Sequence, residues 1–333
     1  MVQRHPEVTE PAPVAGHPPP LPTGTGGELL AVHLQAWATE FLRALRTVRE
    51  QPDTAPRALR RSARRIGGLL HTFRPLLDRD WADGLRGELA WLSTTLAREH
   101  ACADRLDRLL TALTRLSGTP EAPAAVRPSD RTPPDGHTAA GALTLGTAKA
   151  GALLERRLTL ARTRAHSAAL GALGSSRFHG VADRVAVLAS EVPLTPGAVR
   201  QDLGPLAADA AARLTDAVAA LPMPRTPYPS DGLTQDAPWH HVRLLLRLHR
   251  CTRDVLYGDG TGDPRLAAAG RALDRHRDAA EAAADAASAA RTPRIAPATA
   301  YALGVLTADQ RHEVEAARYE FCQLWRTGPV STP

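Results

Sequence analysis

The chain has 333 residues, of which 43% are hydrophobic, and it carries 41 Lys and Arg against 35 Asp and Glu, for a net charge of +6. A chain of this length suggests about two units of roughly 150 residues, and it can bury a core too large for a small disulfide-held scaffold. Its three cysteines, Cys102, Cys251 and Cys322, form no C-x-x-C pair that would indicate zinc or redox chemistry. Lys149 is the only lysine, so the positive charge resides on arginine, whose planar fork matches phosphate and carboxylate.

Two Pro-rich stretches divide the chain. Residues 1–27 are rich in Pro and Gly and have no apolar period, so we expect a disordered tail. Residues 118–138 contain prolines that break any helix. We expect them to link a first half at 28–117 to a second half at 139–327, which a short tail at 328–333 follows. No stretch of eighteen apolar residues and no signal-peptide core occurs, so we expect a cytoplasmic protein that does not contact membranes.

The stretches between these segments are rich in Ala, Leu, Arg and Glu with a helical period, and none has the β-branched alternation of a strand. Short loops separate them, which favours antiparallel neighbours. The sequence therefore predicts an all-α protein of two pseudo-symmetric antiparallel helical bundles. The predicted helices lie near 28–49, 54–77, 79–97, 100–116, 140–172, 175–190, 196–220, 237–257, 264–290 and 298–326.

Two of these helices carry the positive excess. The first basic helix contains no acid between its first and last arginine, and its cationic residues gather on one side of the helix with Arg65 at the margin. These residues are Arg57, Arg60, Arg61, Arg64, Arg65, His71 and Arg74. The second basic helix, from Trp239 to Arg253, also lacks acids, and its spacing predicts a narrow stripe of His240, Arg243, Arg247 and Arg250.

Like charges one turn apart repel each other, so a compensating partner is expected. Acids of neighbouring helices, such as Asp78, Asp83 or Glu88, would provide one explanation, and a solvated basic face would provide another. The alternative is a polyanion that lies across both stripes and accepts bidentate bonds from guanidinium groups. The duplication of the stripe in the two halves favours a long, flexible and phosphate-dense ligand.

The run PRALRRSARRIGGLLHTFRPLL, the run WHHVRLLLRLHR and the segment LDRHRDAAEAA, in this order, resemble the signatures of the CHAD family, the conserved histidine α-helical domain. This resemblance extends over about residues 28–327 and implies two helical bundles around a basic central surface that binds inorganic polyphosphate, with localisation to polyphosphate granules. It implies binding by Arg60, Arg64 and Arg65 and by the second stripe, and we add Arg57 and His71 as candidates. The chain departs from the signatures at several positions, namely Arg57 (for His), Gly67 (for a basic residue), His100 to Ala103 (for an Arg-Asp-x-Asp segment), Leu248 (for Arg) and Cys251 (for Tyr).

Other functions stay open. A metal-dependent phosphohydrolase needs carboxylates beside the basic stripe, and the nearest approaches are Asp274, His276 and Asp278 in one helix and His312, Glu313 and Glu315 in another. Neither spacing puts three ligands on one face, so we expect no catalytic residue, no metal and no cofactor. Nucleic acid is a further candidate, but only 4% of the residues are aromatic, which argues against base stacking. Two further alternatives are that the protein binds an acidic protein partner and that it keeps the fold but has lost its ligand. The sequence does not predict the oligomeric state.

Overall fold

The computed structural model describes residues 25–48, 50–51, 54–118, 136–222, 236–258 and 263–326. Within these ranges the protein is all-α, as predicted, and the only strand-like pairing described is a single antiparallel bridge between Leu77 and Leu194. Most of the expected tail at 1–27, most of the linker at 118–138 and the tail at 328–333 lie outside the described residues.

The described helices follow one another along the chain. They are α1 (Gly26–Thr47), α2 (Ala55–Thr72), the 3₁₀ turn η1 (Arg74–Leu76), α3 (Arg79–Leu116), α4 (Gly136–Leu173), α5 (Ser176–Ser190), the 3₁₀ turn η2 (Ala198–Arg200), α6 (Gly204–Ala219), α7 (Asp236–Tyr257), α8 (Pro264–Ala290) and α9 (Pro297–Arg326).

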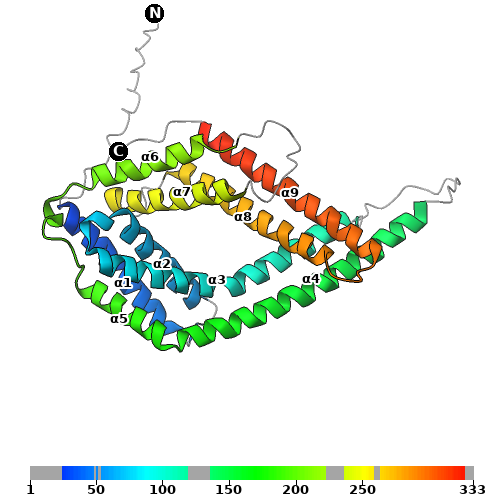
Figure 1. Ribbon diagram of the computed structural model, residues 1–333, viewed down its shortest axis with the longest axis horizontal. Helices are drawn as coiled ribbons and strands as arrows, with labels where there is room; N and C mark the ends of the chain where they lie inside the picture. The colour runs from blue at the N-terminus through cyan, green and yellow to red at the C-terminus, as the bar shows by residue number, and fades with distance from the viewer. Residues whose placement is uncertain are drawn as a thin grey trace, which may run out of the picture.

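The helices form an elongated frame (Figure 1). Helices α3 and α4 pack against each other along one long side, α8 and α9 along the other, and α4 meets α9 at one end. Near the opposite end α2 lies against α7, although the two are far apart in the sequence. The arrangement brings the two basic helices together, one from each half of the chain.

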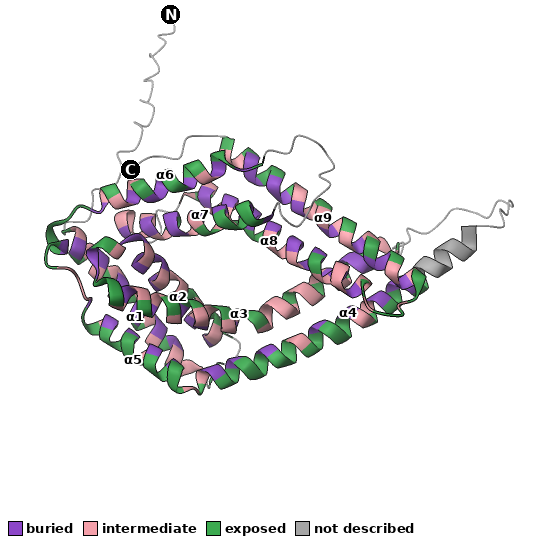
Figure 2. Ribbon diagram, in the orientation of Figure 1, coloured by how far each residue is buried: buried purple, intermediate pink, exposed green. Residues whose placement is uncertain are grey.

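Three large groups of apolar side chains, and a small fourth between α8 and α9, hold the described helices of the frame together. The first joins α1, α2, the start of α3 and α5, and the second joins the end of α3, α4, the end of α8 and the start of α9. The third joins α6, α7, the start of α8 and the end of α9 around the buried Trp239 and Phe321. Figure 2 shows these buried positions on the facing sides of the helices, whereas the middle of α4 is mostly exposed.

The structure corrects three helix boundaries. The two helices expected at 79–97 and 100–116 form one continuous helix, α3, because no Pro or Gly interrupts the chain between Gly87 and Gly118. The helix expected at 54–77 ends at Thr72 and is followed by η1, which contains Pro75. The helix expected at 196–220 is η2 followed by α6.

Packing also crosses the sequence boundary between the two halves. Helix α5 follows the Pro-rich linker in the sequence, yet Phe178, Val181, Val185 and Leu188 of α5 are buried in the apolar group of α1 and α2. Burying this face of α5 against the first bundle removes its apolar surface from water. The apolar groups therefore do not coincide with the expected halves at 28–117 and 139–327.

Candidate polyanion-binding groove

Helix α2 separates apolar from cationic side chains by helical period. Leu59, Ala63 and Ile66 are fully buried on the side that packs into the first apolar group, and this leaves the arginines on the opposite side. Because the helix ends at Thr72, Arg74 falls in η1, where its guanidinium pairs with Asp83 at 2.5 Å. The expectation that Arg74 shares the stripe is therefore wrong.

Helix α7 has the same division with one additional buried polar residue. Val242 and Leu246 are buried in the third apolar group, and Arg243 and Arg247 lie on the other side. His249 is buried without a hydrogen-bond partner among the described residues, and burial lowers its pKa to about 4. This histidine is therefore neutral at physiological pH and belongs to the packing of α7.

The arginines of both helices meet in one cavity of about 460 Å³, which we call the inner cavity. Arg60 and Arg64 of α2 and Arg243 and Arg247 of α7 all line it, so the predicted convergence of the two stripes is confirmed. Two further arginines complete the lining, Arg86 from α3 and Arg277 from α8. Six guanidinium groups from four helices thus surround one space.

A second cavity of about 320 Å³, the outer cavity, shares Arg60, Arg64 and Arg247 with the inner one. It adds the remaining arginines of the two stripes, which are Arg57, Arg61, Arg65 and Arg250. Because these residues line both spaces, the inner and outer cavities adjoin, and we call the two together the basic groove. All seven arginines among the predicted site residues line it.

The predicted histidines occupy different places. His71 lines the inner cavity, where its Nδ1 accepts a hydrogen bond of 2.8 Å from Arg86. Burial and the charge of Arg86 lower the pKa of His71, so its ring is neutral at pH 7 and accepts rather than adds charge. His240 lines neither cavity of the groove and packs instead against His276, with 5.5 Å between ring centroids.

At the other end of the inner cavity, a third cavity of about 510 Å³ lies between α3 and α8 and shares Arg60 and Arg277 with it. We call it the mixed cavity, because both cations and acids line it. The basic side chains added here are Arg98, Arg105 and Arg108, the acidic ones are Asp104, Asp278 and Glu281, and His100 also lines the cavity. The density of uncompensated positive charge therefore falls from the inner cavity toward this end.

Close packing of like charges perturbs the arginines of the inner cavity. Burial, together with the charges of Arg247, Arg60 and Arg243, lowers the pKa of Arg64 to about 9. Burial and neighbouring arginines also lower the pKa of Arg60 and of Arg247. These arginines therefore carry charges that a bound anion would stabilise.

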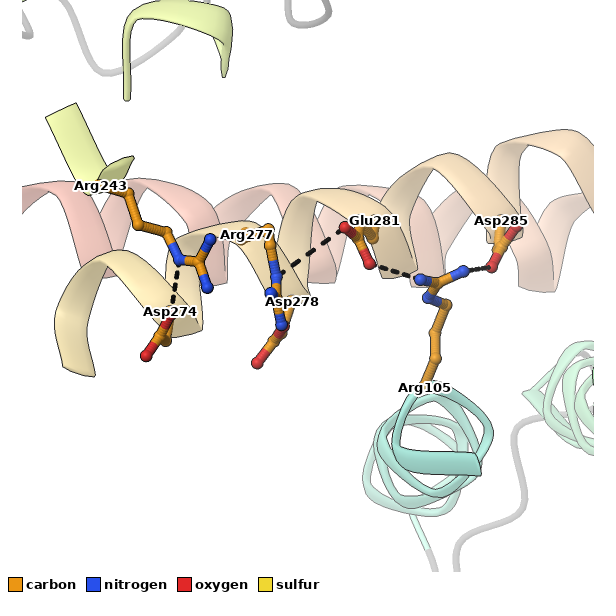
Figure 3. Close-up of polar contacts among 7 residues, drawn as sticks. All are labelled: Arg105, Arg243, Asp274, Arg277, Asp278, Glu281 and Asp285. Atoms are coloured by element: carbon orange, nitrogen blue, oxygen red, sulfur yellow. Dashed lines mark hydrogen bonds and ion pairs between the residues drawn. The ribbon is translucent and has the colours of Figure 1, made fainter. Parts of the chain in front are cut away.

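Acids of α8 compensate part of this charge (Figure 3). Arg243 donates from Nε to Asp274 at 2.5 Å, and Arg277 pairs with Asp278 and lies 3.8 Å from Glu281. Burial lowers the pKa of Arg277, but Asp278 and Glu281 outweigh burial and raise the pKa above its ordinary value. Arg105 reaches from α3 to Glu281 and Asp285 and connects the two long sides of the frame.

Of the acids considered from sequence as partners of the first stripe, Asp83 pairs with Arg74, as that alternative expects, whereas Asp78 and Glu88 have other roles. Asp78 accepts the backbone N–H of Trp81 at the start of α3, and Asp83 pairs with Arg74 and Arg86. Glu88 pairs with Arg177 of α5. Of the stripe itself, Arg65 lies 3.8 Å from Asp254 of α7. The acids at the start of α3 therefore compensate Arg74 of η1 and Arg86 of α3.

The fold does not bring the residues of either candidate metal-binding segment together. His276 is buried beside Asp236, which also binds Arg311 and Arg318, and Glu313 lies near Arg108 and Arg115. Within the described ranges, no group of three or more His, Cys, Asp or Glu side chains is placed to ligate a metal ion. No helix of the described part of the chain combines the length and apolar character needed to cross a bilayer.

Residues 28–319 match the family described as CHAD domain. The chain belongs to this family. Among solved structures, PptA from Streptomyces chartreusis is 61% identical, with a TM-score of 0.79 over 92% of this chain and all of the other. The CHAD domain from the plant Ricinus communis is 18% identical, with a TM-score of 0.54 over 90% of this chain and 92% of the other, and shares the fold. No curated protein matches the chain.

In this CHAD chain, two residues of the groove were not predicted from sequence. Arg86 lies on α3 and Arg277 on α8, outside the two acid-free helices that drew attention to the stripes. Both have acids close by in sequence, so local charge did not distinguish them. The segment that contains Arg277 does resemble a CHAD signature, which was the one signal capable of identifying it.

Four of the departures from the CHAD signatures line the groove, namely Arg57, Gly67, Leu248 and Cys251, and two of them affect its shape. Gly67 lines the inner cavity, and a Cβ atom added there would meet nothing within 4 Å. Cys251 lines both cavities of the groove, and a Cβ atom at Gly68 would contact its Sγ at 3.7 Å and Leu248 at 3.4 Å. Gly67 therefore leaves open space in the groove, whereas Cys251 fills the contact between α2 and α7.

Proposed function

We propose that this protein binds inorganic polyphosphate in the basic groove without hydrolysing it. The convergence of Arg60, Arg64, Arg243 and Arg247 in one cavity carries the proposal. A flexible chain with a negative charge on every unit can follow the inner and outer cavities and meet successive guanidinium groups. A single phosphate can contact only a few of them, so we expect weak binding of orthophosphate.

The groove supplies the chemistry that such a ligand requires. Guanidinium groups make charge-assisted and often bidentate bonds to phosphate oxygens, and the lowered pKa of Arg64 reflects burial and neighbouring like charges that a phosphate would compensate. Binding by charge alone needs no catalytic group. Asp254, which lines the outer cavity, and Asp274 and Asp278, beside the inner cavity, all lie within ion-pair distance of arginines, which supports binding over hydrolysis.

The direct test reverses charge in the groove. We expect Arg243→Glu with Arg247→Glu to lower affinity for long-chain polyphosphate about a hundredfold or more, because two contacts become repulsions. The matched control is Arg156→Glu with Arg164→Glu, which makes the same charge change on the exposed face of α4. Calorimetry measures affinity and circular dichroism confirms the helical content. Retained affinity in the groove variant would place the site elsewhere.

Two further measurements separate the alternatives. We expect no phosphate release from polyphosphate with Mg²⁺ present, and release above background would indicate a phosphohydrolase. We also expect tRNA and duplex DNA to compete poorly at equal phosphate concentration, and efficient displacement would indicate a nucleic-acid site. In a bacterial cell, a fluorescent fusion would then collect at polyphosphate granules.

A further inference from the structure

A further cavity of about 420 Å³, the side cavity, lies between α1 and α2 next to the basic groove. His33, Trp37 and Glu40 of α1 and Arg61, Ser62 and Arg65 of α2 line it. Arg61 and Arg65 also line the outer cavity, so one molecule can extend from the side cavity into the groove. The volume falls in the range of ordinary small-molecule sites.

The lining of the side cavity differs in kind from that of the groove. It includes an aromatic ring and a carboxylate, and the guanidinium of Arg65 lies 3.8 Å above the ring of Trp37. Flat aromatic ligands stack on tryptophan rings and on guanidinium planes. Glu40 pairs with Arg43 at 2.5 Å, and its carboxylate adds negative charge beside the two arginines, so a bare polyphosphate chain meets less net positive charge here than in the groove.

The polar groups of the side cavity favour a ligand with hydrogen-bond donors. Nδ1 of His33 donates to the carbonyl oxygen of Leu29 at 2.9 Å, so in the neutral ring Nε2 is an acceptor. The carboxylate of Glu40 is a second acceptor. The hydroxyl of Ser62 is buried and has no hydrogen-bond partner among the described residues, although it can donate or accept. Such a mixture suits the amino groups and ring nitrogens of a nucleobase.

We propose that the side cavity binds the base of a nucleoside polyphosphate, such as ATP or GTP, whose phosphates extend across Arg61 and Arg65 into the outer cavity. The proposal deepens the proposed function, because the phosphates use arginines of the same groove. It adds a second ligand class, which the side cavity distinguishes from inorganic phosphate chains by its base.

The test compares ATP with inorganic triphosphate, which presents a similar phosphate chain without a nucleoside. Calorimetry on the full chain, without divalent metal and at one ionic strength, should give about tenfold tighter binding of ATP, the size expected of one stacked base. Equal affinity for the two ligands would overturn the proposal. Tight binding of long-chain polyphosphate in the same experiment would show that the groove itself functions and that only the base site is absent.

Two variants assign the preference to the side cavity. Trp37→Leu should reduce the ratio of ATP to triphosphate affinity to about one and leave long-chain polyphosphate binding unchanged, whereas Trp37→Phe should retain most of the ratio. Glu40→Gln changes a residue outside the apolar core and should also lower the ratio. A ratio unchanged by both Trp37→Leu and Glu40→Gln would overturn the assignment. An ATP preference in a protein that fails to bind polyphosphate would refute the proposed function alone.

Discussion

At the scale of single residues, Arg64 shows how the groove is prepared for a ligand. Its guanidinium is partly buried near three other arginines, and these surroundings lower its pKa to about 9. An arginine in water keeps its proton far above that range, so these surroundings make the positive charge of Arg64 cost free energy. A phosphate bound there offsets that cost and gains a charge-assisted hydrogen bond.

Gly67 allows a gain-of-function prediction. Because a Cβ atom there meets nothing within 4 Å and the residue lines the inner cavity, Gly67→Arg should add a phosphate contact. It should also stabilise α2 by up to about 1 kcal/mol, because arginine has a higher helix propensity than glycine. We expect affinity for long-chain polyphosphate to rise several-fold and the dependence on log salt to steepen by about one unit.

The matched control is Gly180→Arg on α5, where an added Cβ atom also meets nothing within 4 Å but which does not line the groove. It should change neither affinity nor salt dependence. Weaker binding by Gly67→Arg would mean that the ligand needs the space at this position, contrary to the prediction.

At the scale of elements, α8 supplies acids to one side of the groove, and they compete with the ligand for arginines. Asp274 pairs with Arg243, so Asp274→Asn should release that guanidinium and raise affinity for polyphosphate about three- to fivefold. Asp209→Asn on α6 removes an exposed ion pair with Arg213 and serves as the control. A loss of affinity in Asp274→Asn would show that Asp274 orients Arg243 for binding and does not compete for it.

The elements differ in how far the sequence predicts them. The buried faces of α2 and α7 follow from helical period, because an apolar stripe opposite a cationic one fixes which side packs inward. The sequence analysis did not predict the continuity of α3, although the absence of Pro and Gly between Gly87 and Gly118 permits it. The packing of α5 on α1 could not be predicted, since an amphipathic period identifies a buried face but not the helix that covers it.

The residues of the candidate site also differ in how far the sequence predicts them. The arginines of α2 and α7 were predicted because each helix alone has an acid-free cationic stripe. Arg86 and Arg277 reach the inner cavity only because α3 and α8 pass beside it. Their contribution depends on tertiary arrangement, as does the pairing of Asp274 with Arg243, and a single sequence does not reveal either.

At the scale of the whole molecule, the groove joins helices from both ends of the sequence, so ligand binding should stabilise the entire fold. Polyphosphate at about a hundred times its dissociation constant should add about 2.7 kcal/mol to the free energy of unfolding and raise the melting temperature by about 5 °C. Differential scanning calorimetry can measure the shift, which should shrink as salt increases. The shift should be absent in Arg243→Glu with Arg247→Glu, and an equal shift with orthophosphate would contradict multi-site binding.

Because α3 is one uninterrupted helix, it fixes the distances between the side chains that it carries. Arg86 and Arg105 lie nineteen residues apart on this one rod, which sets about 28 Å between their positions along its axis. A rod of this kind does not shorten or lengthen when a ligand arrives, so a flexible polymer must conform to the spacing that the protein presents. An oligomer too short to span this distance could therefore reach Arg86 or Arg105 but not both.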